Sequence, residues 1–404
     1  MGSWCLACSY FMMNSMFIAI LVIVPKKTAS SSEESAICVE ESDSSGNSTA
    51  VLTNSTVFQD EKDVIEMSED EKSLLVSAFN IGYVLTQLAG PWLATRIGFK
   101  KVLLISTLFS GILTLGFPVI LKTSVTLAII SRIVAGALSG PAIPVTRESL
   151  SGWAPSSEIG RMVSLQIIGC PVGIVSAQFF GGLLSRYSWQ LVFYLSGLMC
   201  LIWAGIWQFF VFPTPEQDKR CSKEETDYII TKRNASCDRK TAKKVPWGEI
   251  LESIPFWALV IGQLCVQWTI FLILAKFPEF LSVSYGLDVF TIGIIGTTLA
   301  LSLIASGFFG FISDHLAKKK SPTFSRKAIS TTSSMGIALC LVLLTRTACM
   351  FELNIAFALL MAFSVGIGSF LALEPNSMDL APDYSGIVQG LVNTVGNCAG
   401  FGTD

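Results

Sequence analysis

Charged residues are scarce in this chain. Asp, Glu, Lys and Arg make up 14% of its 404 residues, whereas a soluble domain carries roughly 25%. Histidine is scarcer still: His315 is the only one, and nowhere in the sequence do His, Cys, Asp and Glu gather at the spacing of metal ligands. No nucleophile stands beside a paired base either. We therefore expect no enzyme, no metal, no cofactor and no nucleic-acid partner.

Apolar residues are abundant and gathered into long runs. They make up 51% of the chain, and the mean hydropathy is +0.59. Runs such as "VLLISTLFSGILTLGFPVIL" are about the 20 residues that a helix needs to cross a bilayer. The pattern predicts an all-α polytopic membrane protein, which we expect to be a monomer. The spans are expected at residues 5–24, 74–93, 102–120, 125–145, 162–184, 191–212, 256–275, 292–312, 328–344, 353–373 and 387–401.

The connections between these runs differ in charge. Lys and Arg gather in alternate connections, as they do on the cytoplasmic side of membrane proteins. The first connection, residues 25–73, is instead acidic and rich in serine, and it holds glycosylation sequons at Asn47 and Asn54. Such sequons are modified only on the luminal or exterior side. The central connection is basic and is expected in the cytoplasm.

The pattern of runs restarts after the central connection. The segments "GPWLATRIGFKK" and "GFFGFISDHLAKKK" hold matching places in the two halves, with Asp314 aligned on Thr95. Internal similarity of this kind is typical of transporters built from repeated bundles. We expect an N-terminal six-helix bundle (1–212), a cytoplasmic central loop (213–250) and a truncated C-terminal bundle of about five helices (251–404). The last helix of the pattern is expected to be missing from this chain.

Several segments carry a family resemblance. Arg96, Gly98, Lys100 and Lys101 follow the second run in a pattern that resembles the loop motif of the major facilitator superfamily. The segments "FNIGYVLTQLAGPWLATRIG", "RIVAGALSGPAIPVTRESLSGWAP", "WQLVFYLSGLMCLIW" and "MDLAPDYSGIVQGLVNTVGNCAG" resemble its organic-anion branch, which contains sialin, the vesicular glutamate transporters and the sodium-dependent phosphate transporters. The resemblance implies two six-helix bundles and alternating access around a central site.

The same resemblance implies a function. We expect a secondary active transporter, coupled to H⁺ or Na⁺, in the plasma membrane or in a lysosomal or vesicular membrane. Its solute would be a small organic anion that bears a carboxylate, such as sialic acid, glutamate or urate, or else inorganic phosphate. An alternative stays open, because some charges of the branch are absent: a transporter-like receptor that binds a ligand without net flux.

Arg132 lies near the start of a run that is otherwise apolar or small for more than a dozen residues. An isolated arginine at the centre of a bilayer costs at least about 2.5 to 3.5 kcal/mol, so its side chain is expected to face the bundle interior or a watery cavity. Two roles remain open: a buried ion pair, with Glu374 as candidate partner, or a fork of donors that binds an anionic solute. The resemblance favours the second role, because the branch uses the arginine of its fourth helix at the substrate site.

The chain departs from the branch at several positions. Ser139 stands where members that handle amino-acid or sugar acids carry a membrane glutamate, and Arg147, followed by Glu148, stands where they carry a histidine. Asn14 and Val266 replace arginines of the first and seventh helices. These changes remove titratable groups, so proton coupling of the sialin type is in question.

The remaining polar side chains of the predicted core define the expected substrate site. They are Arg132, Tyr83, Asn14, Ser139, Gln267, Trp268, Asn393 and Thr394, with Gln87 as a further polar neighbour. A second set is expected to act in coupling or gating: Glu374, Arg96, Lys100, Lys101, Asp314, Arg147 and Glu148. Simple anchoring on the cytoplasmic side explains the lysines equally well, because Lys is enriched there in any case.

The charges of the connections predict which sequons carry glycan. Asn47 and Asn54 should be glycosylated in cells, and Asn234, which lies in the basic central connection, should not. The measurement is the mass of the protein from cells before and after each Asn→Gln substitution. A glycan that disappears in Asn234→Gln would reverse the predicted orientation.

Overall fold

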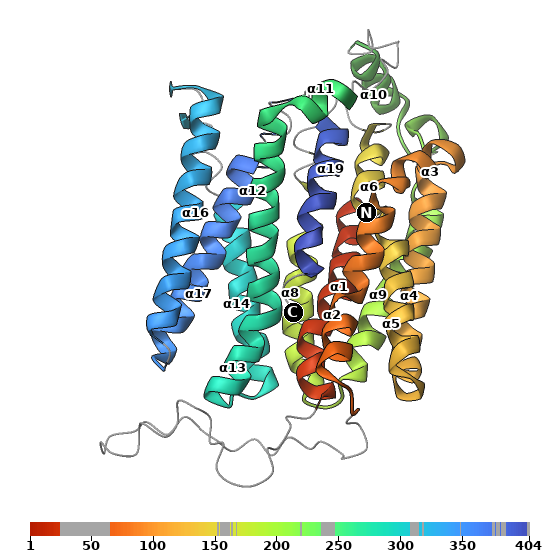
Figure 1. Cartoon of the computed structure of the whole chain (residues 1–404). Coiled ribbons are helices and arrows are strands. Elements are labelled where there is room, and N and C mark those ends of the chain that lie inside the picture. Colours follow the sequence, from red (N-terminus) through yellow and green to blue (C-terminus); the bar gives the residue numbers. More distant parts are fainter. Residues whose placement is uncertain are drawn as a thin grey trace, which may run out of the picture.

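The structure is a computed structural model of the chain. It describes residues 1–24, 65–151, 153, 162, 165–166, 168–218, 220–235, 247–307, 315–316, 319–347, 349–373, 376, 380 and 385–401. Within these ranges the regular structure is helical, and the long helices stand side by side (Figure 1). Asn47, Asn54, Asp314 and Glu374 lie outside the described residues, so their predicted roles stay predictions.

The helices before residue 212 pack on one another, and we call them the first group. α1 packs on α8, α2 on α5, and α4 on both α5 and α9. The short helices α3 and α6 follow α2 and α5 at one end. The bounds are α1 Gly2–Ile23, α2 Glu69–Gln87, α3 Ala89–Ile97, α4 Phe99–Thr123, α5 Val125–Ser139, α6 Ala142–Ser151, α8 Gly169–Ser185 and α9 Gln190–Phe210.

The helices after residue 253 form the second group. α12 packs on α19, and α17 packs on both α14 and α16. The bounds are α12 Ile254–Phe271, η4 Leu272–Lys276, α13 Phe277–Tyr285, α14 Val289–Gly307, α16 Pro322–Arg346, α17 Phe351–Gly366, η5 Ile367–Leu373, α19 Ser385–Asn397 and η6 Cys398–Phe401. The central connection contributes η3 Pro215–Gln217, α10 Lys223–Ala235 and α11 Trp247–Glu252.

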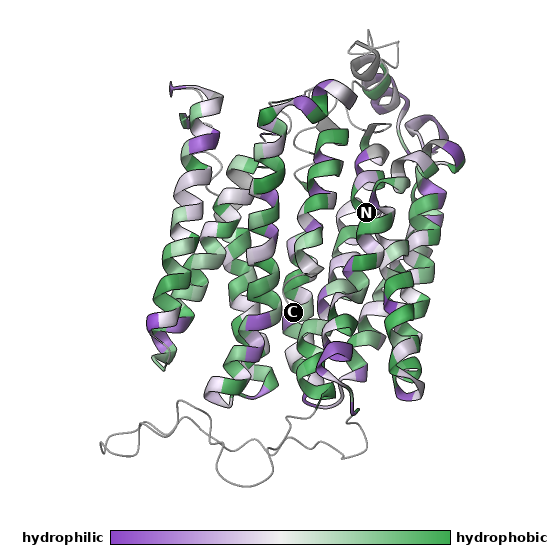
Figure 2. Ribbon diagram, viewed as in Figure 1, coloured by the Kyte–Doolittle hydropathy of each residue, from purple (hydrophilic) through white to green (hydrophobic). Residues whose placement is uncertain are grey.

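We name the two ends of the molecule by their helices. The α10 end bears α10 and α11, and the opposite end bears α13 and the start of α2 (Figure 1). Hydrophobic residues cover the middle of the helices and hydrophilic residues gather toward both ends (Figure 2). In the described part of the chain, seven helices are long and apolar enough to span a membrane. The chain is therefore a multi-pass membrane protein, as the apolar runs predict.

Local signals in the sequence set several helix starts. Ser68 begins α2 with a capping box, in which its hydroxyl accepts from the Glu71 amide and the Glu71 carboxylate accepts from the Ser68 amide. Ser124 and Ser321 cap α5 and α16 in the same position, and Pro322 follows as the first residue of α16. Pro is favoured there because its missing N–H would have no partner inside the helix.

Several predicted spans are divided, changed in helix type or extended in the structure. The span at 125–145 is divided at Gly140–Pro141 into α5 and α6. The span at 353–373 changes into a π-helix, η5, over its last turns. The span at 256–275 does not end at 275: a second π-helix, η4, carries it into α13 and on to Tyr285. π-Helical segments are rare and occur often at functional sites.

The two groups meet most closely where α8 packs on α14. Two glycines make this approach possible: a Cβ atom on Gly182 would lie 2.7 Å from the Cα atom of Gly293, and a Cβ atom on Gly293 would lie 2.5 Å from the Cα atom of Gly182. Membrane helices depend on such small residues, since van der Waals contact drives their association in lipid.

A larger side chain at this contact should therefore destabilise the protein. We expect Gly293→Val to lower the free energy of unfolding by about 1 to 3 kcal/mol, because the α8 backbone cannot move aside without loss of packing. Thermal unfolding of purified protein in detergent measures the effect. Gly205→Ala is the control: a Cβ atom there meets nothing within 4 Å. Equal stability of the two variants would contradict the close approach.

Candidate functional site

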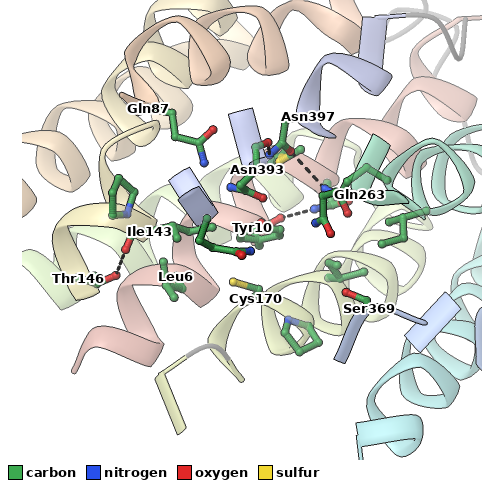
Figure 3. Close-up of a pocket in the computed structure, with 18 of the residues that line it drawn as sticks. Leu6, Tyr10, Gln87, Ile143, Thr146, Cys170, Gln263, Ser369, Asn393 and Asn397 are labelled. Carbon is green, nitrogen blue, oxygen red and sulfur yellow. Dashed lines mark hydrogen bonds between the residues drawn. The ribbon is translucent and has the colours of Figure 1, made fainter. Parts of the chain in front are cut away.

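A cavity of about 120 Å³ lies between the two groups of helices. Its lining comes from α1, α2, α6 and α8 on one side and from α12, η4, α14, η5 and α19 on the other. Polar side chains from several of these helices converge on it (Figure 3). The cavity thus occupies the central position in which the family resemblance places a substrate site.

Side-chain amides dominate the polar lining on the second group. Gln263 and Gln267 stand one turn apart on α12, and Gln389, Asn393 and Asn397 follow at the same spacing on α19. Gln267 Nε2 donates to the side-chain oxygen Oδ1 of Asn397 at 3.4 Å. Because residues four apart share a helix face, each helix presents a row of amides to the cavity.

The first group contributes Asn14, Gln87 and Gln166 to the opposite wall. Asn14 donates to the backbone oxygen of Tyr10 at 2.7 Å, and Gln166 donates to that of Thr146 at 2.7 Å. Thr394 does not line the cavity, but its hydroxyl lies 3.2 Å from the Gln87 side-chain oxygen and so connects α19 to α2. It holds a lining residue in place across the two groups.

Several of these amides keep an atom that no described residue satisfies. The buried atoms without a hydrogen-bond partner in the described part of the chain include Asn14 Oδ1, Gln87 Nε2, Gln166 Oε1, Gln263 Oε1 and Asn393 Nδ2. A buried polar group left without a partner costs about 1 to 3 kcal/mol. Both donors and acceptors are present, so the cavity is built for a polar occupant that can accept and donate hydrogen bonds.

Arg147 supplies positive charge to this cavity. It lies on α6, beside Thr146, and is the one Asp, Glu, Lys, Arg or His residue among the described residues of the lining. The site therefore combines one guanidinium with a ring of neutral amides, which suits a solute that carries one anionic group.

Arg132 lies elsewhere in this structure. It is 2% exposed, and its guanidinium donates to the backbone oxygens of Met12 at 3.0 Å and Met13 at 3.3 Å. It also faces the Phe79 and Phe117 rings, at 4.9 and 5.8 Å from the ring centroids. Carbonyl oxygens and aromatic faces stabilise a guanidinium in an apolar bundle. Arg132 thus joins α5 to α1 and does not itself line the cavity, whereas Met13 and Asn14 of α1 do.

The other expected substrate residues divide into two sets. Asn14, Gln267 and Asn393 line the cavity. Tyr83, Ser139 and Trp268 do not: Tyr83 is buried, the Ser139 hydroxyl lies 2.9 Å from that of Ser110, and Trp268 is 45% exposed on the outer surface of α12. Hydropathy alone cannot assign these positions, because it identifies a span without its inward face.

The expected gating residues of the first group stay at the α10 end. Lys100 donates to the backbone oxygen of Gln208 at 2.9 Å and faces the Phe212 ring, so its described contacts lie on α9 and the residues after it. Arg96 faces the Trp92 ring at 4.2 Å, and Lys101 is exposed. These contacts lie within one group. The side chain of Glu148 is not among the described ones.

Three residues of the cavity lining are absent from the expected substrate site, although the sequence contains a pattern that includes them. Gln263, Gln389 and Asn397 complete two rows, Gln263–Gln267 and Gln389–Asn393–Asn397, at intervals of four residues inside apolar runs. Amides at this spacing lie on one helix face and cannot all be satisfied by lipid. A single amide inside an apolar run does not show this spacing, so the pattern is visible only when the row is considered as a whole.

The contacts of Arg132 predict how its substitution behaves. Arg132→Gln should lower the free energy of unfolding by about 1 to 3 kcal/mol, because charged hydrogen bonds to the α1 carbonyls are lost. Thermal unfolding in detergent measures this, with uptake per folded molecule recorded in parallel. If stability is unchanged while uptake is lost, Arg132 contacts the solute directly instead. Full stability together with full uptake would contradict both roles.

Known proteins share this sequence and fold. Human sialin is 30% identical over 334 residues, which cover 81% of this chain and 66% of sialin. Probable anion transporter 4 of rice is 33% identical over 336 residues, 82% and 56% of the two chains. Vesicular glutamate transporter 3 of zebrafish is 26% identical over 365 residues, 88% and 61%. The chain thus spans about 56 to 66% of the length of these relatives.

Solved structures agree on the fold. The xylose transporter XylE from E. coli, in a partially occluded inward-open conformation, matches with a TM-score of 0.64 and 13% identity over 99% of this chain and 88% of that chain. The family comparison matches the Major Facilitator Superfamily over residues 3–403. The members of this superfamily are transporters, which confirms the prediction that the chain is not an enzyme. The resemblance drawn from the sequence motifs is confirmed: this chain belongs to the Major Facilitator Superfamily.

Proposed function

We propose that this protein transports a small organic anion across a membrane by alternating access. The observation that carries the proposal is the central cavity, which is lined by Arg147 and by a ring of amides, five of which keep an unpaired atom: Asn14, Gln87, Gln166, Gln263 and Asn393. The relatives named as an anion transporter and a glutamate transporter support the same class of solute. Such carriers move a solute by exposing one central site to each side of the membrane in turn.

The chemistry of the lining favours a hydroxylated or amino carboxylate over inorganic phosphate. Arg147 offers a planar fork that pairs with one carboxylate. Each amide around it carries both a donor and an acceptor. Phosphate at neutral pH is mainly an acceptor, so it would leave the amide oxygens of Asn14, Gln166 and Gln263 unsatisfied. Hydroxyl or ammonium groups on the solute would donate to these oxygens.

We further propose that the α10 end faces the cytoplasm. Lys319 and Lys320 lie at that end with Arg96, Lys100 and Lys101, in agreement with the enrichment of Lys and Arg on the cytoplasmic side. Cys349, which lies between α16 and α17 at the opposite end, is disulfide-bonded. Disulfides persist in oxidising compartments, so this bond supports a luminal or exterior location for that end.

The moving parts in this proposal are the two bundles at 1–212 and 251–404, which rock about the cavity between them. The packing of α1, α2, α4, α5, α8 and α9 on one another, and of α12 on α19 and of α14 and α16 on α17, supports this division. We keep H⁺ or Na⁺ as the coupling ion and a monomer as the working unit. The measurement that tests the whole proposal is uptake into proteoliposomes of sialic acid, glutamate, urate and phosphate, under imposed pH and Na⁺ gradients.

We expect net uptake of at least one of the three organic anions and little uptake of phosphate. Saturable binding of an organic anion without flux would instead identify a receptor that keeps the transporter fold. Uptake of phosphate alone would contradict the chemistry assigned to the amides. Absence of both binding and uptake for all four solutes would remove the cavity as their site.

The role of Arg147 gives a sharper prediction. Arg147→Gln should raise the KM of the transported anion about tenfold or more, because a charge-assisted hydrogen bond is worth about 1.5 to 3 kcal/mol. Arg147→Lys should raise it less, since the charge is kept while the fork is lost. Arg346→Gln, an exposed change in the last turn of α16, is the control. An unchanged KM in Arg147→Gln would exclude Arg147 from the site.

A further inference from the structure

An apolar pocket adjoins the central cavity, and we call it the side pocket. It measures about 20 Å³, against about 120 Å³ for the cavity itself. The residues that line both spaces are Pro171 and Ile174 on α8, Ile270 on α12, Leu274 on η4 and Leu303 on α14. Because these residues come from both groups of helices, the side pocket is an extension of the cavity between the groups.

The other described lining residues form the far wall of the side pocket. They are Ile273 on η4, Leu299 and Ala300 on α14, and Ala362 on α17. Each is at most 5% exposed, and none of them lines the cavity. Two of the four are alanines, so a longer side chain at Ala300 or Ala362 would take up the space.

The side pocket differs from the cavity in its chemistry. All of its described lining residues are apolar, whereas the cavity presents Arg147 and side-chain amides. A space of about 10 to 15 Å³ holds one water molecule, so the side pocket has room for about one group of that size. Water needs two to four polar partners in such a space, and the apolar lining supplies no polar side chain. The side pocket therefore favours an apolar group of about the size of a methyl.

The polar and apolar parts of the lining lie apart. In the view of Figure 3, Gln87, Asn393 and Asn397 lie on one side of the cavity, and Cys170, which precedes Pro171 on α8, lies on the other. Arg147 belongs to α6, and no described residue of α6 lines the side pocket. A solute that fills both spaces must therefore carry its polar groups at one end and an apolar group at another.

We propose that the side pocket is a subsite that selects solutes by an apolar substituent of about methyl size. The inference rests on the proposed function, because it takes the central cavity as the site of a carboxylate. Arg147 and the amides hold the carboxylate and the donor groups of the solute, and the methyl group passes Ile174 and Leu303 to contact Ala362. The preferred solute is thus a hydroxy or amino carboxylate with a short alkyl branch.

The test compares 2-hydroxycarboxylates that differ only in their alkyl group. Binding of glycolate, lactate, 2-hydroxybutyrate and 2-hydroxyhexanoate to the purified full chain in detergent is measured by calorimetry, with sialic acid and glutamate measured alongside. We expect lactate to bind about four- to tenfold more tightly than glycolate, because it adds one methyl group that an apolar pocket can bury. The butyl group of 2-hydroxyhexanoate exceeds the space, so this gain should be lost.

Two variants on α17 connect the preference to the side pocket. Ala362→Val fills the space, so lactate should lose its advantage while glycolate binds as it does to the parent. Ala358→Val is the matched control, because Ala358 lies one turn away at 0% exposure, against 1% for Ala362, and does not line the side pocket. Lactate should keep its advantage in this control.

A third variant acts in the opposite direction and keeps the test valid if Ala362→Val does not fold. Leu299→Ala enlarges the side pocket, so the gain in affinity should extend to 2-hydroxyhexanoate.

The outcomes separate this inference from the proposed function. The side pocket is excluded as a subsite if the parent binds lactate no better than glycolate, if affinity rises steadily through 2-hydroxyhexanoate, or if the advantage of lactate survives in Ala362→Val. Binding of sialic acid or glutamate without any dependence on the alkyl group leaves the proposed function standing and removes the subsite alone. Absence of binding for every anion removes both.

Discussion

The organisation of this protein depends on one constraint: a polar group inside the membrane must find a partner within the protein. Arg132 meets it with the carbonyl oxygens of Met12 and Met13 and with two aromatic rings. The serines and threonines of α4 meet it by bonding to backbone oxygens of α4 and α5. In the cavity the constraint is left unmet at five amides, because Asn14, Gln87, Gln166, Gln263 and Asn393 each keep an unpaired atom. These unpaired atoms are the basis for proposing the cavity as the site that an external solute completes.

The sequence predicts the features of the structure that depend on composition. It does not predict the direction in which a side chain points or the residue that the side chain contacts. Apolar runs locate the spans because lipid imposes one rule on every residue within them. The same rule predicts that Arg132 points inward, but it does not distinguish a transport path from a packed interior. In the structure Arg132 is packed between helices and does not line the cavity. Lys276 and Glu279 show the complementary limit. The span is predicted to end at 275, yet the helix continues through α13, where Glu279 pairs with Lys72 of α2.

The cavity residues show why pairs of positions carry more information than single ones. An amide inside a span satisfies itself with a neighbouring helix in most cases, so Gln263 or Gln389 alone predicts little. Repetition at intervals of four residues changes this, because a row of amides on one face needs several partners at once. Arg147 stands where the family branch carries a histidine, and it is expected from the sequence to act in coupling or gating. In the structure it faces the amides, because α6 begins after the break at Gly140–Pro141 and turns that segment toward the cavity.

The contacts that join the two groups are of two kinds, rigid and adjustable, and their arrangement fits alternating access. Gly182 and Gly293 bring α8 and α14 into backbone contact, which fixes the distance between the groups while leaving few side chains to obstruct a rotation. The long-range polar contacts lie away from this axis, at Thr394–Gln87 beside the cavity and at Lys72–Glu279 at the end opposite α10. Contacts of this kind exchange for water at little cost when they separate, because both partners become solvated. In the alternating access proposed above, the tight contact serves as the pivot, and the polar contacts are those that break and re-form as the groups rock.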